Sequence, residues 1–309
     1  MNEAIVLGEE VRSALAEGFA VVSLETSVLS QGLPPPRNAE AAERMSDAIR
    51  ANGAVPAWIG VVGGQVRVGL SGGELERFCE REGIAKVARR DLPAAVASGG
   101  LGATTVSATI FAARAAGLAV AATGGIGGVH PRTGDVSADL LELARTPLLL
   151  VCSGPKSVVD PVATAERLEE LGVAVVGYRC ERLPFFVVRE SPVDLEHRAG
   201  SPAEAAALAA AMRTLGTRSA TLLCNPVPEP SAMDPALVAE AVARCEARAE
   251  REEVHGKALT PFLLSALAEE TGGVSLDANL ALLEANASLA AAVASALAVT
   301  SLPNGREDA

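Results

Sequence analysis

Two side chains have the type and position that covalent and acid–base chemistry would need. Lys156 stands in the turn Ser153–Ser157, directly after the apolar run Leu148–Cys152. A lysine that ends a buried strand can lose its proton on desolvation and form an imine with a sugar aldehyde carbon; otherwise it would pair with a phosphate. Glu25 ends the apolar run Ala20–Leu24, where partial burial would suit a general acid or base. The alternative for Glu25 is a structural carboxylate before a turn.

The scarcity of lysine adds weight to Lys156. The chain has 3 lysines, Lys86, Lys156 and Lys257, against 23 arginines. The two residue types are nearly interchangeable as solvated surface cations, but only lysine can become a neutral nucleophile. Chance residue choice is the alternative explanation. All three lysines are therefore candidate functional residues.

Two glycine-rich segments are candidate ligand-binding turns. In Ser98–Thr109, glycines precede hydroxyl residues at the start of a predicted helix. Backbone N–H groups, hydroxyls and the helix dipole could cradle a phosphate there, although an ordinary helix cap fits the same pattern. In Thr123–His130, four glycines in five residues would let the backbone pass very close to a ligand.

An acidic segment follows the second glycine turn. Asp135 and Asp139 are four residues apart, with His130 nearby, and could hold one hard divalent cation that keeps most of its waters. The alternative is that Asp135 or Ser137 caps the helix predicted to begin near Ala138.

The apolar periodicity predicts the scaffold that positions these segments. Short apolar runs alternate with amphipathic stretches, as in βαβ units with a largely parallel sheet. A hairpin at Gly63-Gly64-Gln65 makes the sheet mixed. We therefore predict a mixed, largely parallel sheet flanked by helices, in a single α/β/α domain over residues 1–309. The predicted strands are Ala20–Leu24, Ala57–Val62, Val66–Val68, Leu118–Ala122, Leu148–Cys152, Val173–Gly177 and Ala220–Cys224. The predicted helices are Asn38–Ala51, Gly73–Arg81, Thr105–Ala116, Ala138–Ala144, Val159–Leu171, Pro202–Leu215, Pro235–Glu253 and a helical region Thr260–Ala298. Functional groups in such sheets collect at the carboxyl ends of the strands, so these segments should converge.

Composition excludes several classes of function. A net charge of −12 and only one Trp and one Tyr argue against nucleic-acid binding, which needs basic tracks or stacking aromatics. We expect no membrane association, because no apolar stretch is expected to reach the roughly 18 residues of a membrane span. The five cysteines form no C-x-x-C pair and are typical of reduced thiols in a cytoplasmic protein.

Together the motifs resemble those of the pseudouridine-5'-phosphate glycosidase family. The resemblance is collinear from about Val21 to Ala287, and all three lysines fall inside it. The matching segments are Leu24–Ser27, Lys86–Pro93, Gly102–Val106, Ala122–His130, Asp135–Leu140, Cys152–Ser157, Cys224–Glu229 and Lys257–Leu264. The resemblance implies an enzyme that reversibly cleaves the C–C glycosidic bond of pseudouridine 5'-phosphate to uracil and ribose 5-phosphate.

The resemblance also implies roles for individual residues. Lys156 would be the covalent nucleophile, acting through a Schiff base, and Glu25 the proton donor. Asp135 would be the ligand of one divalent cation per subunit, commonly manganese, in a homotrimer. The residues expected against the substrate are Lys86, Thr104, Thr105, Val106, Thr123, His130, Ser137, Ala138, Asp139 and Asn279. Gln31 stands where the family often has a histidine, so no acid–base role is expected there.

Two other functions share part of this pattern. A Schiff-base aldolase acting on another sugar phosphate would use Lys156 but needs no uracil pocket. A silent sugar-phosphate or nucleotide-binding regulator would need neither Lys156 nor Glu25, and the presence of both argues against it.

Overall fold

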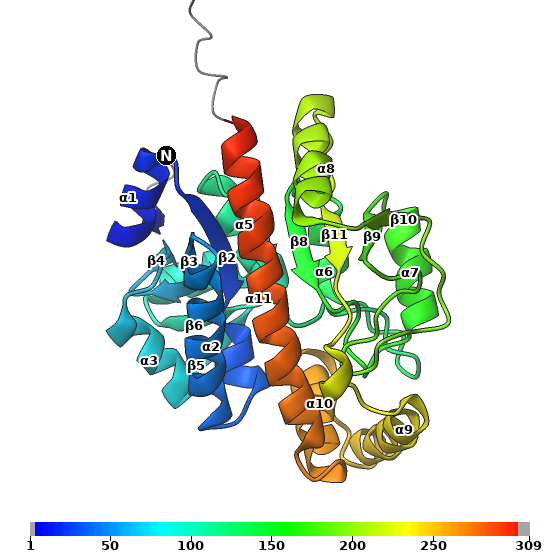
Figure 1. Cartoon of the computed structure of the whole chain (residues 1–309). Coiled ribbons are helices and arrows are strands. Elements are labelled where there is room, and N and C mark those ends of the chain that lie inside the picture. The colour runs from blue at the N-terminus through cyan, green and yellow to red at the C-terminus, as the bar shows by residue number, and fades with distance from the viewer. Residues whose placement is uncertain (1–3, 302–309) are drawn as a thin grey trace, which may run out of the picture.

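One mixed sheet runs through the computed structural model, which describes residues 4–301 (Figure 1). All strand pairs are parallel except those of β3 with β4 and with β6. In spatial order the strands are β1 (Ile5–Leu7), β4 (Gln65–Val68), β3 (Ala54–Val62), β2 (Ala20–Glu25), β7 (Val120–Ala122), β8 (Leu149–Cys152), β11 (Thr221–Cys224), β9 (Ala174–Tyr178) and β10 (His197–Ala199). The predicted mixed, largely parallel sheet is confirmed, and so is the hairpin, because β3 and β4 pair antiparallel on either side of Gly63-Gly64. The single domain over 1–309 stays a prediction.

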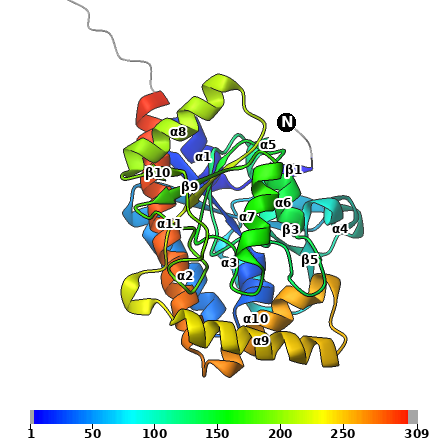
Figure 2. The ribbon, with the colours of Figure 1, turned by 90° about the vertical axis from the view of Figure 1, so that its right-hand side faces the viewer.

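Helices cover both faces of the sheet (Figure 2). On one face lie α2 (Arg37–Ala51), α8 (Pro202–Leu215) and α11 (Val274–Ser301). On the other face lie α1 (Glu9–Glu17), α5 (Val106–Ala115), α6 (Ala138–Leu143) and α7 (Pro161–Glu170). The paired helices α9 (Pro235–Arg251) and α10 (Leu259–Glu270) lie together at the lower end of the molecule (Figure 1). The remaining helices are α3 (Gly72–Glu80) and α4 (Leu92–Ser98), and short turns of helix are η1 (Val28–Gly32), η2 (Arg89–Asp91), η3 (Glu229–Ser231) and η4 (Gly256–Ala258).

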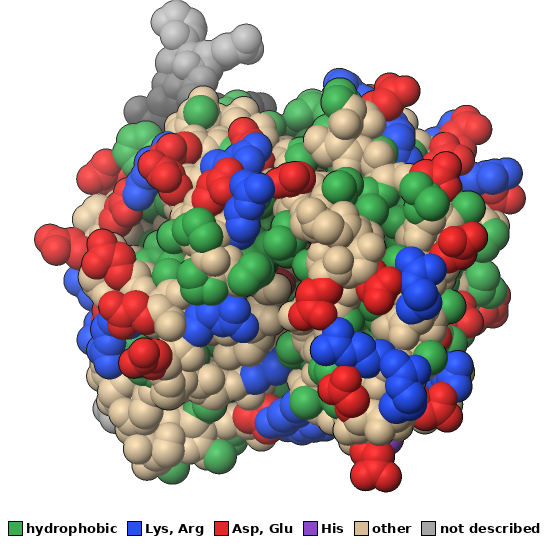
Figure 3. Space-filling model, turned by 90° about the horizontal axis from the view of Figure 1, so that it is seen from below, with side chains coloured by type: hydrophobic (Ala, Val, Ile, Leu, Met, Phe, Trp, Pro, Cys, Tyr) green, Lys and Arg blue, Asp and Glu red, His purple; other side chains and the backbone are tan. Residues whose placement is uncertain are grey.

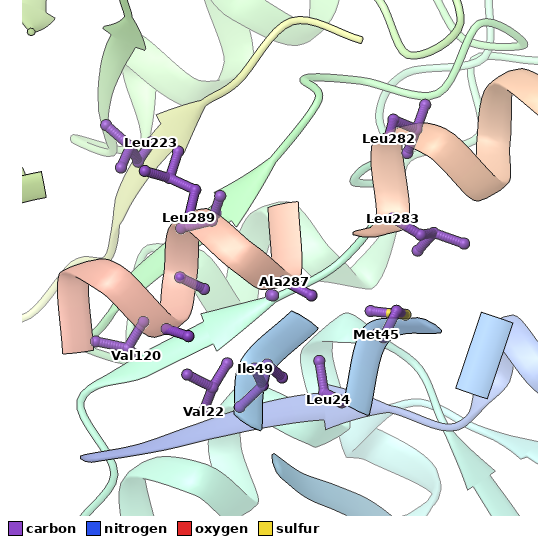
Figure 4. Packing of buried hydrophobic residues seen from close by; sticks show 14 of the residues in the cluster. Val22, Leu24, Met45, Ile49, Val120, Leu223, Leu282, Leu283, Ala287 and Leu289 are labelled. Atoms are coloured by element: carbon purple, nitrogen blue, oxygen red, sulfur yellow. The ribbon is translucent and has the colours of Figure 1, made fainter. Parts of the chain in front are cut away.

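The sheet is buried on both faces because alternate residues of each central strand enter different clusters. Val22 and Leu24 of β2 pack with Met45 and Ile49 of α2 and Ala287 of α11 (Figure 4). The residues of β2 that alternate with Val22 and Leu24 point their side chains to the opposite face of the sheet, because successive side chains of a strand alternate between its two faces. This arrangement explains why the central strands read as continuous apolar runs rather than as alternating ones.

α11 is the longest helix and corrects one expectation. The segment Val274–Val299 is long and apolar enough to cross a membrane, contrary to the prediction that no stretch reaches that length. However, 56% of its most apolar window is buried inside the fold, where it contacts α2, α8 and the central strands. The helical region predicted from Thr260 is also divided, because Gly272 and Gly273 adopt left-handed φ angles of +57° and +89° and separate α10 from α11.

The sequence pattern did not predict four short strands and two helices of the described structure. The strands are β1, β10, β5 (Ile84–Val87) and β6 (Leu101–Thr104), and the helices are α1 and α4. β5 and β6 pair parallel with each other, and β6 pairs with β3. Lys86 lies in β5, so this pairing fixes the position of one of the three lysines. The sequence around Lys86 has no apolar run that would predict the strand.

Candidate active site

The predicted convergence at the carboxyl ends of the strands is confirmed. A cavity there brings together residues at or after the ends of four different strands: Glu25 is the last residue of β2, and Lys156, Gly124 and Thr105 follow β8, β7 and β6. Segments from η4 and α10 complete its mouth through Lys257 and Thr260. The same cavity contains most of the predicted site residues, namely Glu25, Lys86, Thr105, Val106, His130, Asp135, Ser137, Ala138, Asp139, Lys156 and Asn279.

Glu25 is held rigidly in the cavity wall. The residue is 4% exposed. One oxygen accepts a hydrogen bond of 2.5 Å from the Ser27 hydroxyl, and the other accepts one from the Thr123 hydroxyl. These donors fix the carboxyl orientation from opposite sides, so Glu25 can exchange a proton with a bound molecule from one defined position.

All three lysines of the chain line this cavity, but only one side-chain amine is unpaired there. Lys86 Nζ donates to the carbonyl of Lys257 at 3.1 Å, and Lys257 Nζ lies 2.7 Å from the Asp91 carboxylate. Across residues 4–301, Lys156 Nζ makes no hydrogen bond or ion pair. The Lys156 amine is therefore the one available to attack an electrophilic carbon.

The pKa of Lys86 is influenced by several charged side chains of the cavity. Burial lowers the pKa of Lys86 below its ordinary value of 10.5, and the nearby charge of Lys156 lowers it further. The carboxylates of Asp139 and Glu25 act in the opposite direction on the same pKa. A bound phosphate would add negative charge at this point and favour the protonated form of Lys86.

Two of the predicted substrate-binding threonines lie behind the cavity wall. The Thr104 hydroxyl is fully buried and donates to the Ile59 carbonyl at 2.7 Å, while it accepts a bond from Thr109. The Thr123 hydroxyl is committed to Glu25. Neither residue lines the cavity, so both brace the site in this structure, and their direct contact with substrate stays a prediction.

The first glycine segment does not form the predicted cradle. Gly99 ends α4 in a left-handed conformation, and Gly102 lies inside β6, where a Cβ atom would sit 2.7 Å from the Val87 side chain. Only Thr105 and Val106 of the whole segment line the cavity, at the start of α5. The part of this segment that could bind an anion is therefore the N-terminus of α5 rather than Gly99 or Gly102.

The second glycine segment lines the cavity, but the groups closest to its backbone are side chains of the protein itself. A Cβ atom at Gly127 would lie 2.3 Å from the Ser137 hydroxyl, and one at Gly125 would lie 2.8 Å from the Phe186 ring. Asp139 is tied to the same turn, because its two carboxylate oxygens accept 3.0 Å bonds from the backbone N–H groups of Gly127 and Ser107. Asp139 is therefore a brace between the glycine turn and α5.

These bonds affect the predicted cation site. Each carboxylate oxygen of Asp139 already accepts one backbone bond and the side chain is buried, whereas Asp135 is exposed at the cavity wall. His130 is buried, and its Nε2 lies 3.1 Å from the Thr260 hydroxyl. Burial lowers the pKa of His130, against the influence of Asp135. Within residues 4–301, no group of three or more His, Cys, Asp or Glu residues could hold a metal. One carboxylate still fits a hard cation that keeps most of its waters.

The structure adds Gln31 to the cavity lining and Asn286 to its wall, and the sequence pattern had placed neither there. Among residues 4–301, the buried Oε1 of Gln31 has no hydrogen-bond partner, and neither has the Oδ1 of Asn279, which the sequence had predicted to lie in the site. Asn286 is fully buried beneath the Thr123–Gly124 turn. One signal was available: Asn279 and Asn286 are seven residues apart in an alanine- and leucine-rich helix, which places both on one face.

The surface around the lower end of the molecule carries mixed charge. Lys and Arg side chains alternate with Asp and Glu side chains over the face seen from below, without a continuous basic track (Figure 3).

Comparisons with known proteins support a single family. The family described as "Indigoidine synthase A like protein" matches residues 10–296. The chain is 49% identical to a protein of Herpetosiphon aurantiacus named pseudouridine-5'-phosphate glycosidase, over 95% of this chain and 98% of that protein. It is 47% identical, over the same shares, to a protein of that name from Saccharopolyspora erythraea.

Solved structures agree with these sequence relatives. The chain matches the prealnumycin C-glycosynthase AlnA, solved in complex with ribulose 5-phosphate, with a TM-score of 0.89 and 40% identity over 97% of this chain and 99% of that one. It matches an indigoidine synthase A (IdgA)-like protein from Thermotoga maritima with a TM-score of 0.88 and 39% identity, over 95% and 96% of the two chains. The chain therefore belongs to the pseudouridine-5'-phosphate glycosidase family, within the indigoidine synthase A-like proteins.

Proposed function

We propose that this protein cleaves the C–C glycosidic bond of pseudouridine 5'-phosphate to uracil and ribose 5-phosphate, and can run the reaction in reverse. The observation that carries the proposal is the single cavity in which an unpaired lysine amine, a buried carboxyl group and two further lysines lie together. The names of the relatives support the substrate, and the ribulose 5-phosphate complex of AlnA supports a sugar phosphate in this fold.

The leaving atom in this reaction is a carbon of uracil, which explains the need for an amine. An ordinary glycosidase protonates a glycosidic oxygen and uses a second carboxylate, but here no such oxygen exists. In the proposed mechanism, the Lys156 amine bonds to the anomeric carbon while the bond from that carbon to the ring oxygen breaks, and the oxygen takes a proton. The nitrogen lone pair then expels uracil, whose ring carbon is protonated, and leaves an iminium ion. Water adds to the iminium ion and releases ribose 5-phosphate and the free amine.

Glu25 is the proposed carrier of these protons. Its carboxyl group lies in the cavity wall and is held by Ser27 and Thr123 in one orientation. Lys86, Lys257 and the N-terminus of α5 form the proposed phosphate-binding end, since they combine cationic side chains with the positive end of a helix dipole. Ser137 and Ala138 at the start of α6 extend this end.

Asp135 is the proposed ligand of one divalent cation, Mn²⁺, per subunit. When bound, the cation would supply positive charge that orients polar groups through its water molecules. The single exposed carboxylate and the oxygen-only donor chemistry are compatible with a hard cation. A homotrimeric state and a cytoplasmic location are proposed from the resemblance alone; light scattering during size-exclusion chromatography tests the first.

The test is direct detection of both products. Purified protein with Mn²⁺ and pseudouridine 5'-phosphate should release uracil, seen by ultraviolet absorbance after chromatography, and ribose 5-phosphate in equal amount. An aldolase would leave the C–C glycosidic bond intact and release no uracil, and a binding protein would release neither product.

A further inference from the structure

Asn286 of α11 connects the chain segments that carry the two proposed catalytic groups. It is fully buried, and its side-chain nitrogen donates to the Thr123 carbonyl at 2.9 Å and to the Ser153 hydroxyl at 3.0 Å. Its side-chain oxygen accepts a 3.1 Å bond from the Asn225 amide. The three partners follow three neighbouring parallel strands, β7, β8 and β11.

Two of these bonds, those to Thr123 and Ser153, each lead to a proposed catalytic group by one short path. Thr123 supplies the hydroxyl that holds Glu25, so its backbone position sets where that hydroxyl points. Ser153 begins the turn that ends at Lys156, and this turn is joined to the glycine turn by the Lys156 N–H bond to the Ile126 carbonyl at 3.0 Å. The positions of the Glu25 carboxyl group and the Lys156 amine therefore both depend on the side chain of Asn286.

The amide of asparagine is the functional group that this position requires. The N–H groups of the Asn286 amide face the Thr123 carbonyl, the Ser153 hydroxyl and, at a longer 3.4 Å, the Gly124 carbonyl. The amide oxygen of Asn286 faces the Asn225 side-chain donor. An aspartate of the same shape would turn an acceptor toward the carbonyls of Thr123 and Gly124. An apolar residue would leave those buried groups without partners.

We propose that Asn286 is a positioning residue for catalysis, which fixes the distance between the Lys156 amine and the Glu25 carboxyl group. Asn286 is not among the residues that line the cavity, so it would act through the residues that it bonds. This inference rests on the proposed function, because the two groups must cooperate in a single reaction for their spacing to matter. A displacement of about 1 Å in such a pair costs on the order of 100-fold in rate.

The test compares Asn286→Asp and Asn286→Ala with the control Asn52→Ala. Asn52 is a matched asparagine that also bonds to α11, through the Ser288 hydroxyl at 3.0 Å, but lies away from the cavity. We expect kcat for uracil release to fall about 100-fold in both Asn286 variants, with KM changed by less than about threefold. The rate of borohydride trapping of ribose 5-phosphate on Lys156 should fall with kcat. Asn52→Ala should lower the melting temperature while kcat is retained.

A purely structural role predicts a different result. If Asn286→Asp and Asn286→Ala melt at lower temperature but keep kcat and the trapping rate, the inference is wrong. If Asn286→Ala does not fold, Ser153→Ala removes one arm of the network and should lower kcat in the same direction, by roughly three- to tenfold; unchanged kcat in that variant also contradicts the inference. A wild-type protein that releases no uracil would overturn the proposed function itself, and this inference with it.

A second readout checks that Asn286 acts through Glu25. In a Glu25→Gln background, adding Asn286→Ala should lower kcat by much less than in the wild type, because the positioned proton carrier is already gone. Equal losses in both backgrounds would show that Asn286 acts elsewhere.

Discussion

Replacing Glu25 with glutamine should separate catalysis from stability in a single variant. The carboxylate accepts hydrogen bonds from Ser27 and Thr123, and glutamine keeps the size and one acceptor while it removes the transferable proton. Loss of general acid–base catalysis lowers kcat by about 10²–10⁴, or roughly 2.7–5.4 kcal/mol in activation free energy at 1.36 kcal/mol per tenfold. The unfolding free energy should fall by only about 1–2 kcal/mol, since both charge-assisted hydrogen bonds of the carboxylate become neutral ones.

Glu142 provides the matched control for that experiment. It is also buried and accepts hydrogen bonds from Arg89, at 2.6 Å, and from the Thr146 hydroxyl, but it does not line the cavity. Glu142→Gln should therefore lower the melting temperature while kcat stays within about threefold of wild type. Steady-state uracil release and thermal unfolding of both variants give the comparison. Near-normal kcat with a raised KM in Glu25→Gln would refute the assignment and make His130 the next candidate for proton transfer.

Three further perturbations test the phosphate end, the cation and the core. Lys86→Ala should raise KM for pseudouridine 5'-phosphate more than it lowers kcat, because a phosphate contact exists in both ground and transition states. Burial lowers the pKa of Lys86 below 10.5, so the amine loses its charge, and with it phosphate affinity, at a pH below that value. Wild-type KM should therefore rise with pH already below 10.5. Lys86→Arg, which stays charged, should remove this rise in steady-state assays. Excess chelator should abolish turnover without unfolding seen by circular dichroism, and Mn²⁺ should restore more activity than Ca²⁺; full activity in chelator contradicts a metal requirement. Leu24→Ala empties a fully buried position under α2 and α11 and should lower the unfolding free energy by about 2–5 kcal/mol in urea titrations.

The sequence was sufficient where local pattern and packing agree. β8 and β11 are fully buried apolar runs, and α8 begins and ends at its predicted residues, between the Ser201 cap with Pro202 and the left-handed Gly216. Lys156 and Glu25 were predictable because Glu25 ends one buried strand, β2, and Lys156 stands in the turn after another, β8. In these cases no distant contact is needed to decide the structure.

The remainder depends on contacts that sequence spacing does not show. β5 is a four-residue strand whose outer members are apolar while Lys86 interrupts them, and it forms because β6 lies beside it. Glycines at 99 and 102 looked like a phosphate cradle, yet they end α4 and pack against Val87. Asn286 carries no motif of its own, and its role follows only from the convergence of three strand ends.

The covalent role of Lys156 is the central claim, and borohydride trapping measures it most directly. The protein is incubated with ribose 5-phosphate, reduced with sodium borohydride, digested and mapped by mass spectrometry. We predict one ribose 5-phosphate adduct, on the side-chain amine of Lys156, which is the lysine of the cavity without a hydrogen bond or ion pair among residues 4–301. An adduct on Lys86 or Lys257, or no adduct in an enzyme that releases uracil, would contradict it.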